Sequence, residues 1–77
     1  KFNCIITRAL ETIPETLRRV KDLVNSDGMV IFMKGPNCSE EIREAVSTAS
    51  LIFKLESDIH YSISTQDKRR LVTFIRS

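Results

Sequence analysis

Two cations stand directly after apolar runs of the chain. Arg8 follows the short apolar and β-branched run from Phe2 to Thr7, and Lys34 follows the unbroken apolar run 29–33. In open α/β sheets, ligands bind outside the carboxyl ends of the strands, so both cations would lie at that edge. A guanidinium there could pair bidentately with a carboxylate or a phosphate. The alternative for Arg8 is a surface arginine paired with Glu11. The position of Arg8 in the sequence does not by itself distinguish an anion-binding role from this surface ion pair.

The segment after Lys34 has the composition of a loop that approaches a ligand. Gly35 lets a backbone come close to a bound group, and Pro36 stiffens the chain. Lys34 and Gly35 could therefore contact a cofactor or a nucleic-acid phosphate. A plain strand-to-helix turn also favours glycine, proline and asparagine, and this alternative stays open. The segment is not a phosphate-binding Walker loop, because the second glycine and the following lysine are missing.

A basic run near the end of the chain is a second candidate for contact with phosphates. Residues 68–70 are Lys-Arg-Arg, and Arg70 is the predicted contact. A basic turn beside a solvated strand is the alternative. His60 stands at a polar position of an alternating segment, where a solvated histidine is expected rather than a general base. No catalytic acid or base stands out in the sequence.

The two cysteines favour neither a disulfide framework nor a metal site. Cys4 and Cys38 are too few for the first and too far apart for a local metal site. Cys4 lies in an apolar run and is predicted to be a small core residue. Cys38 lies in an expected loop, where an exposed reduced thiol suits the cytoplasm. No apolar run approaches the roughly 20 residues that span a membrane.

The elements that would position these residues follow from periodicity. Residues 12–15, Thr-Ile-Pro-Glu, form a capping box, and Ile13, Leu17, Val20 and Val24 make one apolar helix face behind it. Residues 25–28 predict the end of this helix, where Gly28 is able to take the left-handed conformation. Residues 29–33 predict a buried strand, and a second helix follows, capped by Asn37 or Ser39.

The last third of the chain changes to period two. Apolar and polar residues alternate from 53 to 63, which predicts a strand with one wet face and Tyr61 in the core. A turn at 64–67 and a final strand from Arg69 to Arg76 complete an antiparallel hairpin. The fold class is therefore α/β, in the order strand-helix-strand-helix-strand-strand.

These elements make half of a doubly wound sheet. The helices can cover little more than one side of it, and the first strand would be an apolar, unpaired edge. The chain has 77 residues, with 42% apolar and 29% charged residues, as in ordinary globular proteins. We therefore expect residues 1–77 to be a single partial domain, whose missing strands lie N-terminal to Lys1.

Short sequence motifs indicate which family of α/β proteins the chain resembles. Residues 7–9, Thr-Arg-Ala, resemble the strand end Ser-Arg-Ala of the GidB (RsmG) family, and Lys34-Gly35 resembles the end of that family's next strand. The Glu pair at 40–41 and the segment Arg70-Leu71-Val72 fit the same order. The resemblance covers essentially the whole chain, but only the C-terminal part of the family. Residues 63–65 depart from it, because the family usually carries Pro-Gly there.

The resemblance implies the C-terminal half of a Rossmann-like methyltransferase that uses S-adenosyl-L-methionine and methylates guanine N7 in small-subunit ribosomal RNA, in the cytoplasm. Arg8 would then lie at the cofactor site, and Lys34, Gly35 and Arg70 would contact RNA or substrate. The family's glycine-rich loop and its ribose-binding acidic residue are not in these residues. The chain alone is therefore expected to be inactive and to need the N-terminal half of the same domain as its partner.

A non-catalytic interpretation remains beside this one. The chain could be a small, stand-alone α/β binding or scaffold module, which would explain the lack of a glycine-rich loop. Such a module would fold cooperatively alone, or as a dimer that buries the first strand.

Overall fold

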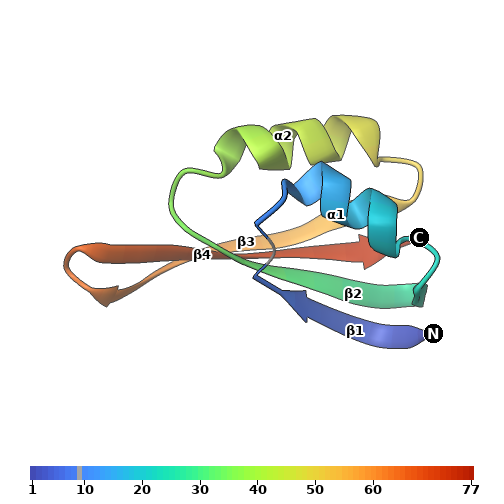
Figure 1. Ribbon diagram of the computed structural model, residues 1–77, viewed down its shortest axis with the longest axis horizontal. Helices are drawn as coiled ribbons and strands as arrows, with labels where there is room; N and C mark the ends of the chain where they lie inside the picture. Colours follow the sequence, from blue (N-terminus) through green and yellow to red (C-terminus); the bar gives the residue numbers. More distant parts are fainter. Residues whose placement is uncertain (9) are drawn as a thin grey trace.

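The computed structural model describes residues 1–8 and 10–77 and contains one mixed sheet with two helices (Figure 1). Ala9 of the Thr-Arg-Ala motif lies outside the described residues. The elements, in chain order, are β1 (Phe2–Thr7), α1 (Ile13–Val20), β2 (Val24–Lys34), α2 (Ser39–Thr48), β3 (Phe53–Ser64) and β4 (Asp67–Arg76). The predicted order of strands and helices is confirmed.

The sheet has the spatial order β1-β2-β4-β3. β1 and β2 are parallel, and α1 provides the crossover between them. β4 lies between β2 and β3 and is antiparallel to both. The predicted α/β class and the antiparallel final hairpin are therefore confirmed, with the last strand beginning at Asp67 rather than Arg69. No helix in the described residues is long and apolar enough to cross a membrane.

Both helices pack on the same face of the sheet (Figure 1). The core between the helices and the sheet combines apolar side chains of the helices with those of β2 and β4 and with Phe53 of β3, each at most 8% exposed. Phe32 and Phe74 meet edge to face at its centre, with ring centroids 6.1 Å apart. Burying one such side chain contributes about 1.5–3 kcal/mol. The main contributors are Ile13, Leu17, Val30, Phe32, Ile42, Ala45, Val72 and Phe74.

Neither helix lies on the opposite face of the sheet, which carries several exposed apolar side chains. Ile6 is 64% exposed and Ile59 52% exposed. Tyr61, predicted to be in the core, is 37% exposed, so that prediction is wrong. Alternation along β3 was correctly expected, and Phe53 at its start belongs to the core. Beyond the bulge between Leu55 and Ser57, however, the polar residues of β3 share the helix-covered face, and Ile59 and Tyr61 point away from it. The physical reason is that, among residues 1–8 and 10–77, no second layer covers this face (Figure 1).

The cysteines are also placed opposite to expectation. Cys4 is exposed and Cys38 is buried. Cys4 pairs in register with Met29 on the uncovered face. Cys38 is the N-cap of α2 without a side-chain capping bond, so neither Asn37 nor Ser39 caps that helix. Burial raises the pKa of the Cys38 thiol, the opposite of what a reactive cysteine needs.

The boundary between α1 and β2 differs from the prediction. α1 begins as expected, because the Thr12 side chain accepts a hydrogen bond from the backbone N–H of Glu15. It ends at Val20, and Val24, predicted as its last apolar position, begins β2 while remaining 1% exposed. The left-handed residue is Asp27, with φ 66°, rather than Gly28. Aspartate is one of the few residues besides glycine that adopt this conformation readily.

Candidate functional site

The carboxyl ends of the two parallel strands meet at one edge of the sheet. Thr7 of β1 is in register with Phe32 of β2, so Arg8, directly after β1, and Lys34, the last residue of β2, lie at the same edge. Figure 1 shows that the β3–β4 turn projects beyond this edge. The edge where the sequence placed its candidate residues therefore exists, and the predicted residues converge on it.

Arg8 is exposed at this edge. Glu11, its suggested structural partner, is instead engaged by Arg19, whose Nη2 lies 2.5 Å from Glu11 Oε1. Glu11 also accepts a hydrogen bond from the hydroxyl of Thr16 at 3.2 Å. Within the described residues, the ion pairs do not include Arg8. Its guanidinium is therefore available to an incoming anion.

The side chain of Lys34 is bound by other residues of the protein. Its Nζ lies 3.0 Å from Glu41 Oε1 and donates a hydrogen bond to the backbone carbonyl of Glu11 at 3.1 Å. Glu41 Oε1 also accepts from the backbone N–H of Ile13 at 3.0 Å, at the start of α1. The lysine therefore links the end of β2 to the N-terminal ends of both helices. Its side chain is only 14% exposed.

Arg70 is buried, at 6% exposure, and pairs bidentately with Asp58. Nε donates to Asp58 Oδ1 at 3.1 Å and Nη2 to Oδ2 at 2.5 Å. Nη1 donates to the backbone carbonyl of Pro36 at 3.2 Å and to the Ser39 hydroxyl at 2.7 Å. The hydrogen bonds that Arg70 donates to Asp58 lower the pKa of the Asp58 carboxyl. We call Arg70 and Asp58 the hairpin clamp, because they fix the loop between β2 and α2 against the hairpin.

Gly35 has no structural requirement for glycine in the described residues. A Cβ built on it would meet no atom within 4 Å, and no glycine has a positive φ. At Gly28, in contrast, a Cβ would lie 2.6 Å from Val24 Cγ1 and 2.8 Å from the carbonyl oxygen of Asn25. Packing accounts for Gly28. The open space at Gly35 leaves room for a ligand to approach the backbone.

The two glycines make a matched test of this difference. Gly28→Ala is expected to lower the free energy of unfolding by about 1–3 kcal/mol, because the new methyl group overlaps fixed atoms. Gly35→Ala is expected to keep it or raise it by less than about 1 kcal/mol, since the unfolded chain loses freedom. Urea denaturation of both variants measures the difference. Equal losses at the two positions would contradict the account of Gly35.

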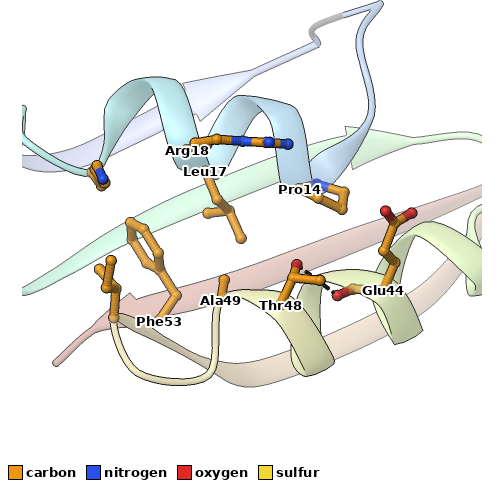
Figure 2. Close-up of a pocket in the computed structure, with 9 residues that line it drawn as sticks. Pro14, Leu17, Arg18, Glu44, Thr48, Ala49 and Phe53 are labelled. Carbon is orange, nitrogen blue, oxygen red and sulfur yellow. Dashed lines mark hydrogen bonds between the residues drawn. The ribbon is translucent and has the colours of Figure 1, made fainter.

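A hollow of about 300 Å³ between the helices lies outside this edge (Figure 2). Its lining comes mainly from the two helices and includes Leu17, Ala49 and Phe53. The dashed bond in Figure 2 joins the Thr48 hydroxyl to the Glu44 carbonyl within one helix, at 2.8 Å. None of the predicted site residues lines this hollow. In the described residues, no group of histidine, cysteine, aspartate and glutamate side chains could hold a metal ion.

Sequence reasoning missed the partners of the two internal cations. Asp58 was expected on the solvated face of an alternating strand, Glu41 was named only as part of the Glu pair at 40–41, and Ser39 only as a possible helix cap. A signal for Asp58 did exist. It stands at a polar position of one hairpin strand, close to the basic run of the other, and opposite charges pair across antiparallel strands.

The order β1-β2-β4-β3, with a parallel crossover and a terminal antiparallel hairpin, defines an α/β protein whose sheet is compatible with part of a Rossmann-like methyltransferase. No family model matches the chain. Its sequence is 47% identical over 73 residues to ribosomal RNA small subunit methyltransferase G 2 of Syntrophobacter fumaroxidans. It is 41% identical over 70 residues to the protein of the same name from Bdellovibrio bacteriovorus. These alignments cover 94% and 90% of the chain.

The predicted resemblance to the GidB family is thereby confirmed, since the chain is similar to a segment of these methyltransferases. A third relative, ribosomal RNA small subunit methyltransferase G of Syntrophus aciditrophicus, is 41% identical over 44 residues, which are 57% of the chain and 18% of that relative. The chain spans 15% and 28% of the lengths of the first two relatives.

Proposed function

We propose that this chain is part of a cytoplasmic methyltransferase that transfers a methyl group from S-adenosyl-L-methionine to guanine N7 of small-subunit ribosomal RNA. The observation that carries the proposal is the 47% identity, over 94% of the chain, to a protein named ribosomal RNA small subunit methyltransferase G 2. The exposed Arg8 and the open space at Gly35, both at the carboxyl edge of the sheet, support it.

The residues at this edge fit the proposed cofactor. Arg8 offers a guanidinium to a carboxylate, and S-adenosyl-L-methionine carries one. The backbone at Gly35 can approach a flat or bulky group, because no atom occupies the place of its missing Cβ. Lys34, held by Glu41, sets the position of the loop that begins at Gly35.

The proposed reaction requires little acid–base chemistry from the side chains. The cofactor supplies a methyl group that its sulfonium already activates for displacement. Guanine N7 has an in-plane lone pair and no proton to lose, so no general base is required. The protein then has mainly to align donor and acceptor, an effect worth about 7–11 kcal/mol at best.

The rest of the proposed domain would cover the face of the sheet that neither helix reaches. β1 is hydrogen-bonded to a neighbouring strand only on the β2 side within the described residues. Apolar residues such as Ile6 and Ile59 lie more than half exposed. Both features support an N-terminal half of the same domain that adds strands beside β1 and a layer on the open face. The chain alone would then be inactive.

Arg8→Ala is expected to weaken the binding of S-adenosyl-L-methionine by about 10- to 100-fold, the equivalent of one charge-assisted hydrogen bond. Isothermal titration of the protein that includes the remaining sheet measures this affinity. Arg43→Ala, which removes an exposed arginine from α2, is the matched control and should bind normally. An unchanged affinity in Arg8→Ala would remove Arg8 from the site.

Transfer of a labelled methyl group to small-subunit RNA by the protein that includes the remaining sheet tests the reaction itself. Cleavage of the product RNA at N7-methylated guanine identifies the acceptor atom. A label at another atom would overturn the N7 assignment while keeping methyl transfer. Absence of both cofactor binding and transfer would favour the non-catalytic binding module.

A further inference from the structure

The β3–β4 hairpin extends past the end of β2. The last register pair between β2 and β4 is Lys34 with Arg70. Beyond it, Arg69 and Lys68 pair only with Tyr61 and Ser62 of β3. Figure 1 shows this free end of the hairpin reaching beyond the carboxyl edge where β1 and β2 stop. A substrate at that edge would therefore lie beside the hairpin.

A hollow of about 280 Å³ lies between this free end and the loop that follows β2. We call it the hairpin hollow. His60 and Arg70 are in register, as are Ser62 and Lys68, so these four side chains share the face that the helices also occupy. Pro36 closes the hollow on the loop side. Its lining residues are Pro36, His60, Tyr61, Ser62, Lys68, Arg69 and Arg70.

The cations around the hairpin hollow differ in how far the protein already uses them. The guanidinium of Arg70 already donates hydrogen bonds to Asp58, Pro36 and Ser39. Arg69 donates to both carboxylate oxygens of Asp67, at 2.8 and 3.3 Å. Lys68 is exposed, and the side-chain hydrogen bonds and ion pairs found within residues 1–8 and 10–77 do not include it.

His60 adds a further donor to the hollow. Its side chain is 69% exposed, and its Nε2 lies 3.7 Å from Asp58 Oδ2. The nearby carboxylates, Asp58 and Asp67, are each occupied by an arginine. The hollow therefore keeps an excess of positive charge and an available ammonium, the combination that binds phosphate.

We propose that a phosphate of the RNA backbone binds in the hairpin hollow, with Lys68 as its main contact and His60 as a second donor. The inference rests on the proposed function and names the contact residues for its RNA substrate. Arg70, which the sequence suggested as an RNA contact, instead holds Pro36 and the hairpin together and so shapes the hollow. The phosphate would lie beside Gly35, where the target nucleotide approaches the edge of the sheet.

Fluorescence anisotropy with a short, fluorescein-labelled RNA hairpin of small-subunit ribosomal sequence tests the proposal over a series of salt concentrations. Lys68→Gln is expected to weaken binding several-fold at low salt. It should also reduce the slope of log affinity against log salt by about 0.7–0.9, the value for one lost phosphate contact. Lys68→Glu should weaken binding further.

Lys54→Gln is the matched control. Lys54 is an exposed lysine of β3 in register with Ile75, away from the free end of the hairpin, and its loss should leave affinity and slope unchanged. Wild-type affinity and slope in Lys68→Gln would overturn the proposal. So would a loss in Lys54→Gln as large as that in Lys68→Gln, or an absence of salt-dependent RNA binding by the unsubstituted protein.

A parallel titration with S-adenosyl-L-methionine, on the protein that includes the remaining sheet, separates this inference from the proposed function. Lys68→Gln should bind the cofactor normally. Cofactor binding combined with RNA affinity that is insensitive to Lys68 would overturn the RNA contact alone. RNA binding that depends on Lys68, without cofactor binding, would overturn the methyltransferase proposal and keep the contact.

Discussion

Phe74→Ala is expected to remove a large share of the stability of the fold. Phe74 is 0% exposed, and its ring packs edge to face on Phe32. Phe-to-Ala substitutions in a core cost about 3–5 kcal/mol, because they lose transfer free energy and leave a cavity. A chain of 77 residues has about 4–12 kcal/mol of stability in all, at the usual value per residue. Urea denaturation followed by circular dichroism measures the change.

Phe2→Ala is the matched control for this prediction. Phe2 begins β1 and is 57% exposed, so its truncation removes the same ring without opening an internal cavity. We expect a loss below about 1 kcal/mol, as for most surface substitutions. A loss of similar size in the two variants would show that the core is not centred on the contact between Phe32 and Phe74.

The start of α1 and the order of the strands were predictable because local signals determine them. The Thr12 cap, a proline in the first turn and the spacing of Ile13 and Leu17 act within a few residues. Unbroken apolar runs followed by an alternating segment likewise distinguished the parallel strands from the hairpin. These features depend on backbone geometry near each residue, so the sequence alone carries them.

The end of α1 was predicted wrongly because Val24 is buried in either conformation. A helical spacing from Val20 and a strand position facing the helices both place it in the core, where it is 1% exposed. Periodicity therefore could not decide between them. The strand assignment depends on β1, since the backbone N–H of Phe2 donates to the carbonyl of Leu23 at 2.7 Å. Tertiary contacts of this kind override local propensity.

The faces of the sheet could not be assigned from period two alone. Alternation shows which residues share a face, but not which face the helices cover. Both helices lie on the side of Val72 and Phe74, and this leaves Cys4 and Ile59 on the other. The errors at Cys4 and Tyr61 have this common origin. An expected core on both faces needs a second layer, which these residues do not contain.

The candidate site was predictable in its location and not in its internal contacts. Strand ends placed Arg8 and Lys34 at one edge, because the position of a strand end follows from the chain itself. The partners of Arg70 are separated from it by 12, 31 and 34 positions, at Asp58, Ser39 and Pro36. No local pattern specifies contacts at such separations. Arg70 therefore has an internal role that the sequence did not reveal, while its contact with RNA stays a prediction.

Arg70→Leu is expected to lower the free energy of unfolding by about 2–4 kcal/mol near pH 7. Removing one partner of a buried ion pair costs up to about 5 kcal/mol, and the side chain of Asp58, 25% exposed, recovers part of its hydration. The loop would also lose its bonds at Pro36 and Ser39. Arg69→Leu breaks an exposed pair with Asp67 and should cost much less than Arg70→Leu.

The pH dependence of this loss identifies its cause. The hydrogen bonds from Arg70 hold the pKa of Asp58 below its usual 3.8, so the pair contributes stability above that value. The contribution disappears as the pH falls through the lowered pKa of the folded state. The difference between the wild-type protein and Arg70→Leu should therefore be largest near neutral pH and should shrink on acidification. Urea titrations at a series of pH values measure it. A difference that stays constant down to the lowest pH would mean that Arg70 stabilises the fold through packing of its side chain rather than through the hairpin clamp.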